Sequence, residues 1–228
     1  MEFVVIIIIS IIAIILLKIG FNVKIKDIKK IKEIGYDKEL NKIANKFPNN
    51  KKICEEILKQ LKNTNVKIEE NAESQTSLYI ALTNKIIIAN INDTFSRIQT
   101  IAHECCHSIQ NRVTLIFNFV FSNIFILYFL VALGLILLDI GNPFVFIQVF
   151  SIMAIIYCAI KCYLETEAMS KAKYVAKEYM QSNASYEDVN LLVEKFDEIN
   201  KVGIPATNFS IIVGNLVKII ILSIAALI

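Results

Sequence analysis

Residues 3 to 17 read FVVIIIISIIAIILL, an apolar stretch that is interrupted by a single serine and followed by Lys18. A helix needs about 20 predominantly apolar residues to cross a hydrocarbon core of about 30 Å, and residues 19 to 21 extend the stretch to nearly that length. No basic segment precedes it and no small-residue cleavage site follows it, as a secretory signal peptide would require. We therefore predict that residues 1–21 form a retained transmembrane anchor.

Three further apolar stretches have the length of membrane spans: 113–138, 143–160 and 209–228. Only the short turn at 139–142 separates the first two, which predicts a transmembrane hairpin over 113–160. The composition agrees, because 55% of the 228 residues are hydrophobic and 20% are charged, whereas soluble domains average about 45–50% and about 25%. This hydrophobicity excludes intrinsic disorder. A net charge of +3 that is spread along the chain excludes a nucleic-acid-binding class.

The distribution of lysines predicts how these spans are oriented, because loops that face the cytoplasm are enriched in Lys and Arg. Several lysines follow the first span, whereas only Met1 and Glu2 precede it, and the turn at 139–142 holds neither Lys nor Arg. A cluster of lysines also follows the third span. We therefore predict a multi-pass protein of the cell membrane, with the lipid bilayer as a partner, an external N-terminus, and cytoplasmic segments at 22–112 and 161–208.

The two cytoplasmic segments show helical and strand periodicity. The elements predicted before the motif described below are helices at 37–47 and 50–62 and strands at 66–68, 77–82 and 85–89. Turn and cap residues at 90–94 predict that a further helix begins there and runs to about residue 111. In the second segment we predict that the third span continues as a helix through 161–181. A helix at 185–201 should follow, and a break at Gly203 and Pro205 should precede the last span.

Residues 103 to 107 read His-Glu-Cys-Cys-His, an HExxH motif on the helix that follows the 85–89 strand. Residues four apart lie on one side of a helix, so His103 and His107 can bind one metal ion, and neutral imidazole is a good ligand for Zn²⁺. Glu104 projects beside them, where its carboxylate can act as the general base on a metal-activated water. A helix with two solvated histidines is the alternative. Both histidines of the chain fall in this motif, however, which favours the metal site.

A catalytic zinc ion usually has three protein ligands and a water molecule. Because the chain has no third histidine, the third ligand must be an Asp, Glu or Cys on the cytoplasmic side. Glu165 is the best candidate, since it follows the third span and the hairpin at 113–160 returns this end of the chain to the helix that bears His107. Glu167 is the second candidate, and is otherwise a solvated carboxylate at the membrane surface.

The order of these elements resembles the YugP-type bacterial membrane proteins, a family of neutral zinc metallopeptidases, over nearly the whole chain. The shared order is an N-terminal anchor, a small cytoplasmic domain, a strand, HExxH followed by Ser-Ile-Gln, a membrane hairpin, a Glu-x-x-Ala segment and a last span. The family's HEVGHAIQ is similar to residues 103–110, and its EFxASxRA pattern corresponds to residues 165–172. The resemblance implies a gluzincin-like core with one Zn²⁺ per chain. It implies Glu104 as the general base and, as ligands, His103, His107 and Glu165.

Two stretches depart from the family pattern. Cys106 stands where the family has a glycine, and Gln75-Thr76-Ser77-Leu78-Tyr79 stands where it has an Asp-His-Tyr-Asp-Pro stretch, so that histidine is missing here. A cysteine close to the metal can coordinate it or be oxidised. The alternative, which we favour for Cys106, is a small apolar filler on the buried face of the helix.

Two other features bear on function. The strand at 85–89 precedes the motif helix, so it is either an edge strand that pairs with an extended substrate or an ordinary core strand. Lys218 lies within the last apolar stretch, where a charge costs about 2.5–3.5 kcal/mol, so we expect it to find a polar partner. The candidate partners in the second span are Asn118, Ser122 and Asn123.

Two functions fit these observations. The first is a mainly α membrane protein with four transmembrane helices and a small α+β gluzincin-like zinc-peptidase core on the cytoplasmic side. It would hydrolyse peptide bonds of membrane-associated or misfolded proteins. The second is a non-catalytic or degenerate membrane scaffold that retains a structural zinc site. An intramembrane protease of the site-2 type fits less well, because polar residues at 90–100 lead into the motif and place it at the membrane boundary. We predict the first function, with a protein or peptide as substrate.

Overall fold

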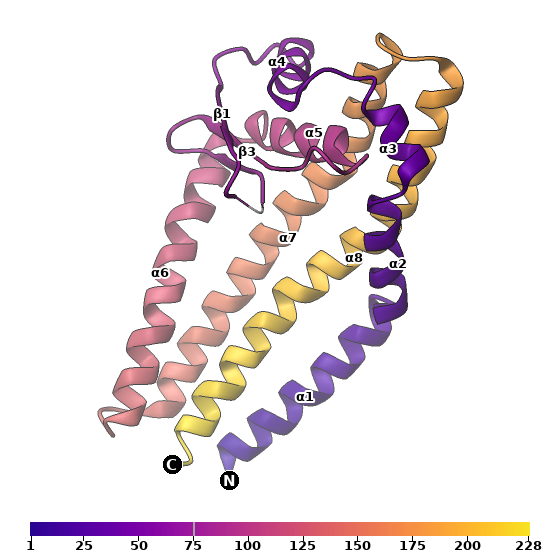
Figure 1. Cartoon of the computed structure of the whole chain (residues 1–228). Helices are drawn as coiled ribbons and strands as arrows, with labels where there is room; N and C mark the ends of the chain where they lie inside the picture. Colours follow the sequence, from indigo (N-terminus) through magenta and orange to yellow (C-terminus); the bar gives the residue numbers. More distant parts are fainter. Residues whose placement is uncertain (75) are drawn as a thin grey trace. The chain divides into compact units, whose positions relative to one another are not determined.

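The computed structural model of the chain describes residues 1–74 and 76–228 and is mainly helical (Figure 1). Its helices are α1 (Glu2–Gly20), α2 (Ile25–Gly35), α3 (Lys38–Ala44), α4 (Asn50–Gln60), α5 (Arg97–Ser108), α6 (Arg112–Leu137), α7 (Pro143–Gln181) and α8 (Tyr186–Ala225). Its strands are β1 (Lys67–Asn71), β2 (Leu78–Ile80) and β3 (Lys85–Ala89). The chain folds into two compact units. The helical unit comprises Met1–Val23, Ile116–Tyr163 and Pro205–Ile228, and the sheet unit comprises Lys24–Leu115 and Leu164–Ile204.

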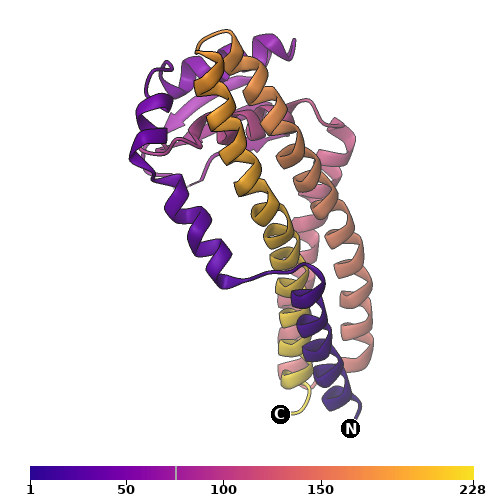
Figure 2. The same ribbon diagram turned by 90° about the vertical axis from the view of Figure 1, so that its right-hand side faces the viewer.

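Within the described residues, α1, α6, α7 and α8 are each long and apolar enough to cross a membrane. The four long apolar helices predicted from the sequence are therefore confirmed. Figure 2 shows α6, α7 and α8 side by side in the helical unit, where buried side chains from all three form one core. The predicted continuation of the third span is also confirmed, because α7 runs without a break to Gln181.

The predicted break before the last span is wrong. α8 is continuous from Tyr186 to Ala225 and contains Pro205. A proline in a helix interior removes one backbone hydrogen bond, here the bond to the carbonyl of Lys201. Packing on both sides of the proline outweighs this loss, since Asn200 accepts a hydrogen bond from Gln99 and Leu222 is fully buried.

Lys218 finds its partner within its own helix. Its ammonium donates to Asn215 Oδ1 at 3.1 Å and lies 5.8 Å from the centroid of the Phe125 ring. Among the described residues it makes no hydrogen bond to the predicted partners on α6, which were Asn118, Ser122 and Asn123. The Ser122 hydroxyl and the Asn123 amide instead donate to backbone carbonyls one turn earlier in α6, as short polar side chains in helices commonly do.

The sheet unit contains a mixed sheet with the strand order β1-β3-β2. β3 is parallel to β1 and antiparallel to β2, where Tyr79 lies opposite Ile86. The strand at 85–89 is therefore central, so it is a core strand and cannot accept a substrate strand at its edge. Its alternate residues Ile86 and Ile88 are buried in the same core as α4 and α5, which holds the motif helix against the sheet.

The two helices directly before the sheet, α3 and α4, begin at side-chain caps. The Asp37 carboxylate accepts hydrogen bonds from the backbone at the start of α3, and the Asn49 side chain does the same for α4. α5 begins at Arg97, a few residues later than predicted. Thr94 lies in the preceding loop, where its hydroxyl donates to the Gly35 carbonyl and accepts from the Ser96 N–H.

The buried guanidinium of Arg97 fixes the start of α5 to the turn between α3 and α4. Nη1 donates to the Pro48 carbonyl at 2.9 Å and to Asn50 Oδ1 at 2.8 Å. Nη2 donates to the Ala44 carbonyl at 2.8 Å and to the Phe47 carbonyl at 3.0 Å. Since three of these acceptors lie at or just beyond the C-terminal end of α3, the helix dipole also favours the positive charge.

Candidate metal centre

One face of α5 is open. Within residues 96–107 the partly exposed positions are Ser96, Thr100, His103 and His107, and every other position is buried. Their spacing of three and four residues places them in one stripe along the helix. The other faces of α5 pack against the sheet and α4. The side chains of the two motif histidines therefore project from this exposed stripe.

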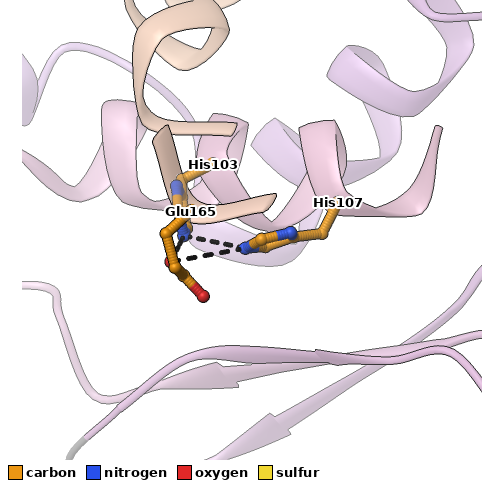
Figure 3. Close-up of side chains that lie close together, drawn as sticks. All are labelled: His103, His107 and Glu165. Carbon is orange, nitrogen blue, oxygen red and sulfur yellow. Dashed lines mark hydrogen bonds and ion pairs between the residues drawn. The ribbon is translucent and has the colours of Figure 1, made fainter. Parts of the chain in front are cut away.

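The structure brings the three predicted ligands together, as Figure 3 shows. One potential ligand atom from each of His103, His107 and Glu165 lies within 4.8 Å of the others. The two Nε2 atoms are 3.1 Å apart, and Glu165 Oε2 lies 3.5 Å from His103 Nε2 and 3.8 Å from His107 Nε2. The histidines come from α5 and the glutamate from α7, and all three residues belong to the sheet unit.

These distances fit one shared metal ion. A tetrahedral site with metal–ligand bonds of about 2.0–2.1 Å has donor atoms about 3.3 Å apart, and the three observed separations lie close to that edge length. Two imidazoles and one carboxylate are a donor set used by zinc enzymes and also by non-haem iron enzymes. The cluster can therefore hold a divalent cation and leave coordination positions open.

Gln110 determines which nitrogen of His107 faces the cluster. The Gln110 amide nitrogen donates to the Leu164 carbonyl at 2.8 Å and to Glu167 Oε2 at 2.9 Å. Its Oε1 must therefore accept the hydrogen bond from His107 Nδ1, which is 2.8 Å away. With the proton on Nδ1, the lone pair of Nε2 points to the cluster, as a metal ligand requires.

Glu167, the second candidate for the third ligand, has a different place. One carboxylate oxygen accepts from Gln110, and the other accepts from the Lys171 ammonium at 2.6 Å. Glu167 thus supports the residue that orients His107, while Glu165 occupies the cluster. This role of Gln110 was not predicted from the sequence, although its position three residues after His107, about one helical turn away, was a usable signal.

Glu104 is buried beside the cluster. Its side chain is 8% exposed, and Oε1 lies 4.0 Å from His103 Nε2. The backbone N–H of Tyr79 on β2 donates to the carboxylate. Burial raises the pKa of the Glu104 carboxyl, and the two neighbouring histidines counteract that rise. A carboxyl whose pKa is raised is better suited to accept a proton and to return it.

The surroundings of His107 favour positive charge. Burial lowers the pKa of this imidazole, but hydrogen bonding to Glu165 and Gln110 outweighs burial, so that the net pKa is raised. The Glu165 carboxylate and the ring orientation of His107 that Gln110 holds would also stabilise a metal cation placed between the three ligand atoms. Electrostatics and geometry therefore point to the same location.

Cys106 is not part of the cluster. It is 1% exposed and lies in the core of the sheet unit together with Ala168 of α7. Burial raises the pKa of the thiol to about 12, as expected for a cysteine that packs among apolar side chains. These observations support the interpretation of Cys106 as an apolar filler where the similar family has a glycine.

No family model, no curated protein and no solved structure matches this chain. The resemblance to the YugP-type proteins therefore depends on the motif residues and on their order along the sequence. In the departing stretch at 75–79, Gln75 lies outside the described residues, and Leu78 and Tyr79 belong to β2. Tyr79 is the residue of this stretch that contacts the site, because its backbone N–H donates to the Glu104 carboxylate.

Replacing Glu165 by alanine is expected to abolish stoichiometric metal binding, whereas Glu167→Ala should retain it. The first change removes one of three ligands, so affinity should fall by more than the ~10–100-fold that loss of an outer partner costs. Metal analysis of the two purified variants tests this directly. A Glu165→Ala protein with full metal content would contradict the placement of Glu165 in the cluster.

Replacing Gln110 by alanine is expected to weaken metal binding by about 10–100-fold without removing a ligand. The reason is that His107 loses the acceptor that holds the proton on Nδ1. Competition with a chelating dye of known affinity provides the measurement. Ser108→Ala is the matched control, because the Ser108 hydroxyl donates to the Cys105 carbonyl and does not contact the cluster. Equal affinities in the two variants would show that Gln110 does not orient His107.

Proposed function

We propose that this protein is a membrane-embedded zinc metalloendopeptidase. The observation that supports this function most strongly is the convergence of His103, His107 and Glu165 next to a buried carboxylate, Glu104. Two histidines of HExxH, a downstream glutamate and a general base are the parts that a gluzincin-type peptidase uses. A bound zinc ion would supply a Lewis acid and lower the pKa of water to near neutrality.

The residues of the chain have distinct roles in this proposal. Glu104 accepts a proton from the attacking water and later delivers it to the leaving amine, while the Tyr79 N–H holds its carboxylate in place. Gln110 keeps the His107 lone pair directed at the cluster. Glu165 contributes a negative charge that offsets the charge of the cation.

A cavity of about 520 Å³ beside α5 supports a polypeptide substrate. Ser96 and Thr100 line it, and they belong to the same open stripe of α5 as the two metal-binding histidines. Four isoleucine side chains and the ring of Tyr36 contribute to its lining; the isoleucines are Ile28, Ile31, Ile91 and Ile199. The volume lies within the range typical of ligand sites, and aliphatic side chains of a substrate are the chemistry that this lining fits.

The position of β2 also supports an extended substrate. Among the described strands β2 pairs only with β3, so no strand pairs with its other edge. The Tyr79 N–H points away from β3 to Glu104, which places this edge at the site. We propose that an extended substrate lies along this edge of β2 while the Tyr79 N–H stays bound to Glu104, and not along the 85–89 strand as one prediction had it.

We propose further that α1, α6, α7 and α8 cross the cell membrane and that the sheet unit faces the cytoplasm. The support is the length and hydropathy of the four helices together with the lysine distribution. A cysteine introduced at exposed Lys38 should then escape a membrane-impermeant maleimide in intact cells, whereas one introduced at exposed Ile140 should react. Labelling is compared with the parent chain, which contains the five native cysteines. The reverse labelling pattern would overturn this orientation.

Hydrolysis of a casein-like or membrane-anchored reporter by the purified, detergent-solubilised chain tests the proposed activity. Cleavage should require bound metal, should be lost in His103→Ala together with the metal, and should be restored by zinc after chelation of the parent protein. A chain that binds metal but cleaves no reporter, whatever metal is added, would leave the non-catalytic scaffold with a structural metal site as the better function.

A further inference from the structure

The helix α2 follows the candidate membrane helix α1 at a short distance along the chain. α1 ends at Gly20 and α2 begins at Ile25. A fully extended chain covers about 3.3–3.6 Å per residue, so these two ends are at most about 18 Å apart. If α1 crosses the bilayer, the start of α2 therefore lies at the depth of the headgroups or just above it.

Four of the five lysines at 24–32 form no ion pair with a described residue. Lys24, Lys26, Lys29 and Lys32 are exposed, and none of them forms an ion pair with any described residue. Lys30 differs, because its ammonium lies 2.6 Å from the Glu198 carboxylate and so links α2 to α8 within the sheet unit. With Asp27 and Glu33 as the acidic residues of α2, the unpaired charge that remains is positive.

The apolar face of α2 is only partly used by the protein. Ile34, near the C-terminal end, packs against the core of the sheet unit, and Ile28, Ile31 and Lys32 line the cavity described above. At the N-terminal end Ile25 is 65% exposed and Ile28 is 39% exposed. At 100° per residue, Ile25, Ile28, Lys29 and Lys32 project within about 100° of one another. One side of α2 thus combines exposed isoleucines with unpaired lysines.

We propose that α2 is an interfacial helix that binds anionic phospholipids. Ile25 inserts between the headgroups, and the exposed lysines beside it bind lipid phosphates. An apolar strip flanked by lysines is the arrangement with which amphipathic helices lie on anionic membranes. This inference depends on the proposed membrane insertion of α1, but it does not depend on the proposed peptidase activity.

The absence of tryptophan from the sequence makes a direct test possible. In the full chain, Ile25→Trp introduces a single indole on the proposed face. The matched control is Tyr186→Trp, an exposed aromatic position at the start of α8. α7 continues for about 30 Å beyond residue 160, the predicted end of the span, so the adjacent start of α8 lies far from the bilayer in the proposed topology.

Both variants are reconstituted into vesicles of phosphatidylcholine with or without phosphatidylglycerol, and brominated acyl chains are used as quenchers. The Ile25→Trp emission should shift to shorter wavelength and be quenched in the anionic vesicles, while Tyr186→Trp stays unquenched. Adding Lys29→Gln and Lys32→Gln should abolish the difference between the two lipid compositions, because each lysine near an anionic surface strengthens binding about fivefold.

Quenching that is equally strong in neutral vesicles would overturn the recognition of anionic lipid, and absence of quenching in both would overturn the docking of α2. Resistance of the chain to extraction by alkaline carbonate is measured on the same vesicles. A chain that is extracted contradicts the membrane insertion in the proposed function. A chain that resists extraction but shows an unquenched Trp at position 25 contradicts the α2 inference alone.

Discussion

Replacement of Glu104 by glutamine is expected to lower peptide hydrolysis by about 10²–10⁴-fold while metal content stays at that of the parent protein. Glutamine has nearly the same shape and can fill the same buried site beside His103, where Glu104 Oε1 lies 4.0 Å from Nε2. It can still accept the hydrogen bond from the Tyr79 N–H. It cannot accept a proton from water, and that loss of general-base function is the reason for the expected effect.

Reporter cleavage and metal analysis on the same Glu104→Gln preparation separate the two roles. Glu69→Gln is the matched control, because it makes the same chemical change in a carboxylate that pairs with Lys85 on the sheet and lies outside the cluster. Its cleavage rate should equal that of the parent chain. Unchanged hydrolysis in Glu104→Gln would remove Glu104 as the general base even if zinc were present.

Replacement of Arg97 by alanine is expected to destabilise the sheet unit by about 3 kcal/mol or more. Hydrogen bonds to a charged group contribute about 1.5–3 kcal/mol each, and this guanidinium makes four of them in a site that is 4% exposed. Alanine would leave buried acceptors without donors at the C-terminal end of α3. Arg97→Lys should restore part of the stability, because one ammonium cannot match the fork of a guanidinium.

Thermal unfolding in detergent, followed by the loss of helical signal, measures this effect. Arg112→Ala is the matched control, since Arg112 is the other arginine of the chain, is exposed, and stands at the start of α6. Its midpoint should lie within error of that of the parent protein. Equal midpoints for Arg97→Ala and Arg112→Ala would show that the four hydrogen bonds do not hold α5 in place.

The elements that depend on local sequence were the easiest to predict. Uninterrupted apolar length sufficed for the four long helices, and the β-branched run at 85–89 sufficed for β3. The error at Pro205 arose because local helix propensity was weighed without the packing around Asn200 and Leu222, which outweighs one lost hydrogen bond. Tertiary contacts of this kind are not visible in a single sequence.

The parts of the candidate site that depend on long-range contacts were predicted less completely. His103, Glu104 and His107 could be found because their chemistry lies in five consecutive residues. Glu165 could be named for two reasons. The chain has no third histidine, and the hairpin returns the chain near the motif helix just before residue 165. The role of Gln110 depends on Leu164 and Glu167, more than fifty residues away.

The central position of β3 was equally hard to predict, because strand order depends on which distant segments pair. α2 was missed as a separate element, although its isoleucines recur every three residues between Ile25 and Ile34.

The short strand β2 makes the register of the sheet a condition for the proposed catalysis. Backbone N–H groups along a strand point alternately to its two edges. With Tyr79 opposite Ile86, its N–H faces Glu104. A slip of β2 by a single residue would turn that N–H toward β3 and leave the base without its donor. Asn84 opposes such a slip, since its side chain accepts from the Tyr79 hydroxyl and donates to the Asn65 carbonyl. The alignment of three residues, secured by one turn asparagine, therefore sets the position of the proposed proton acceptor.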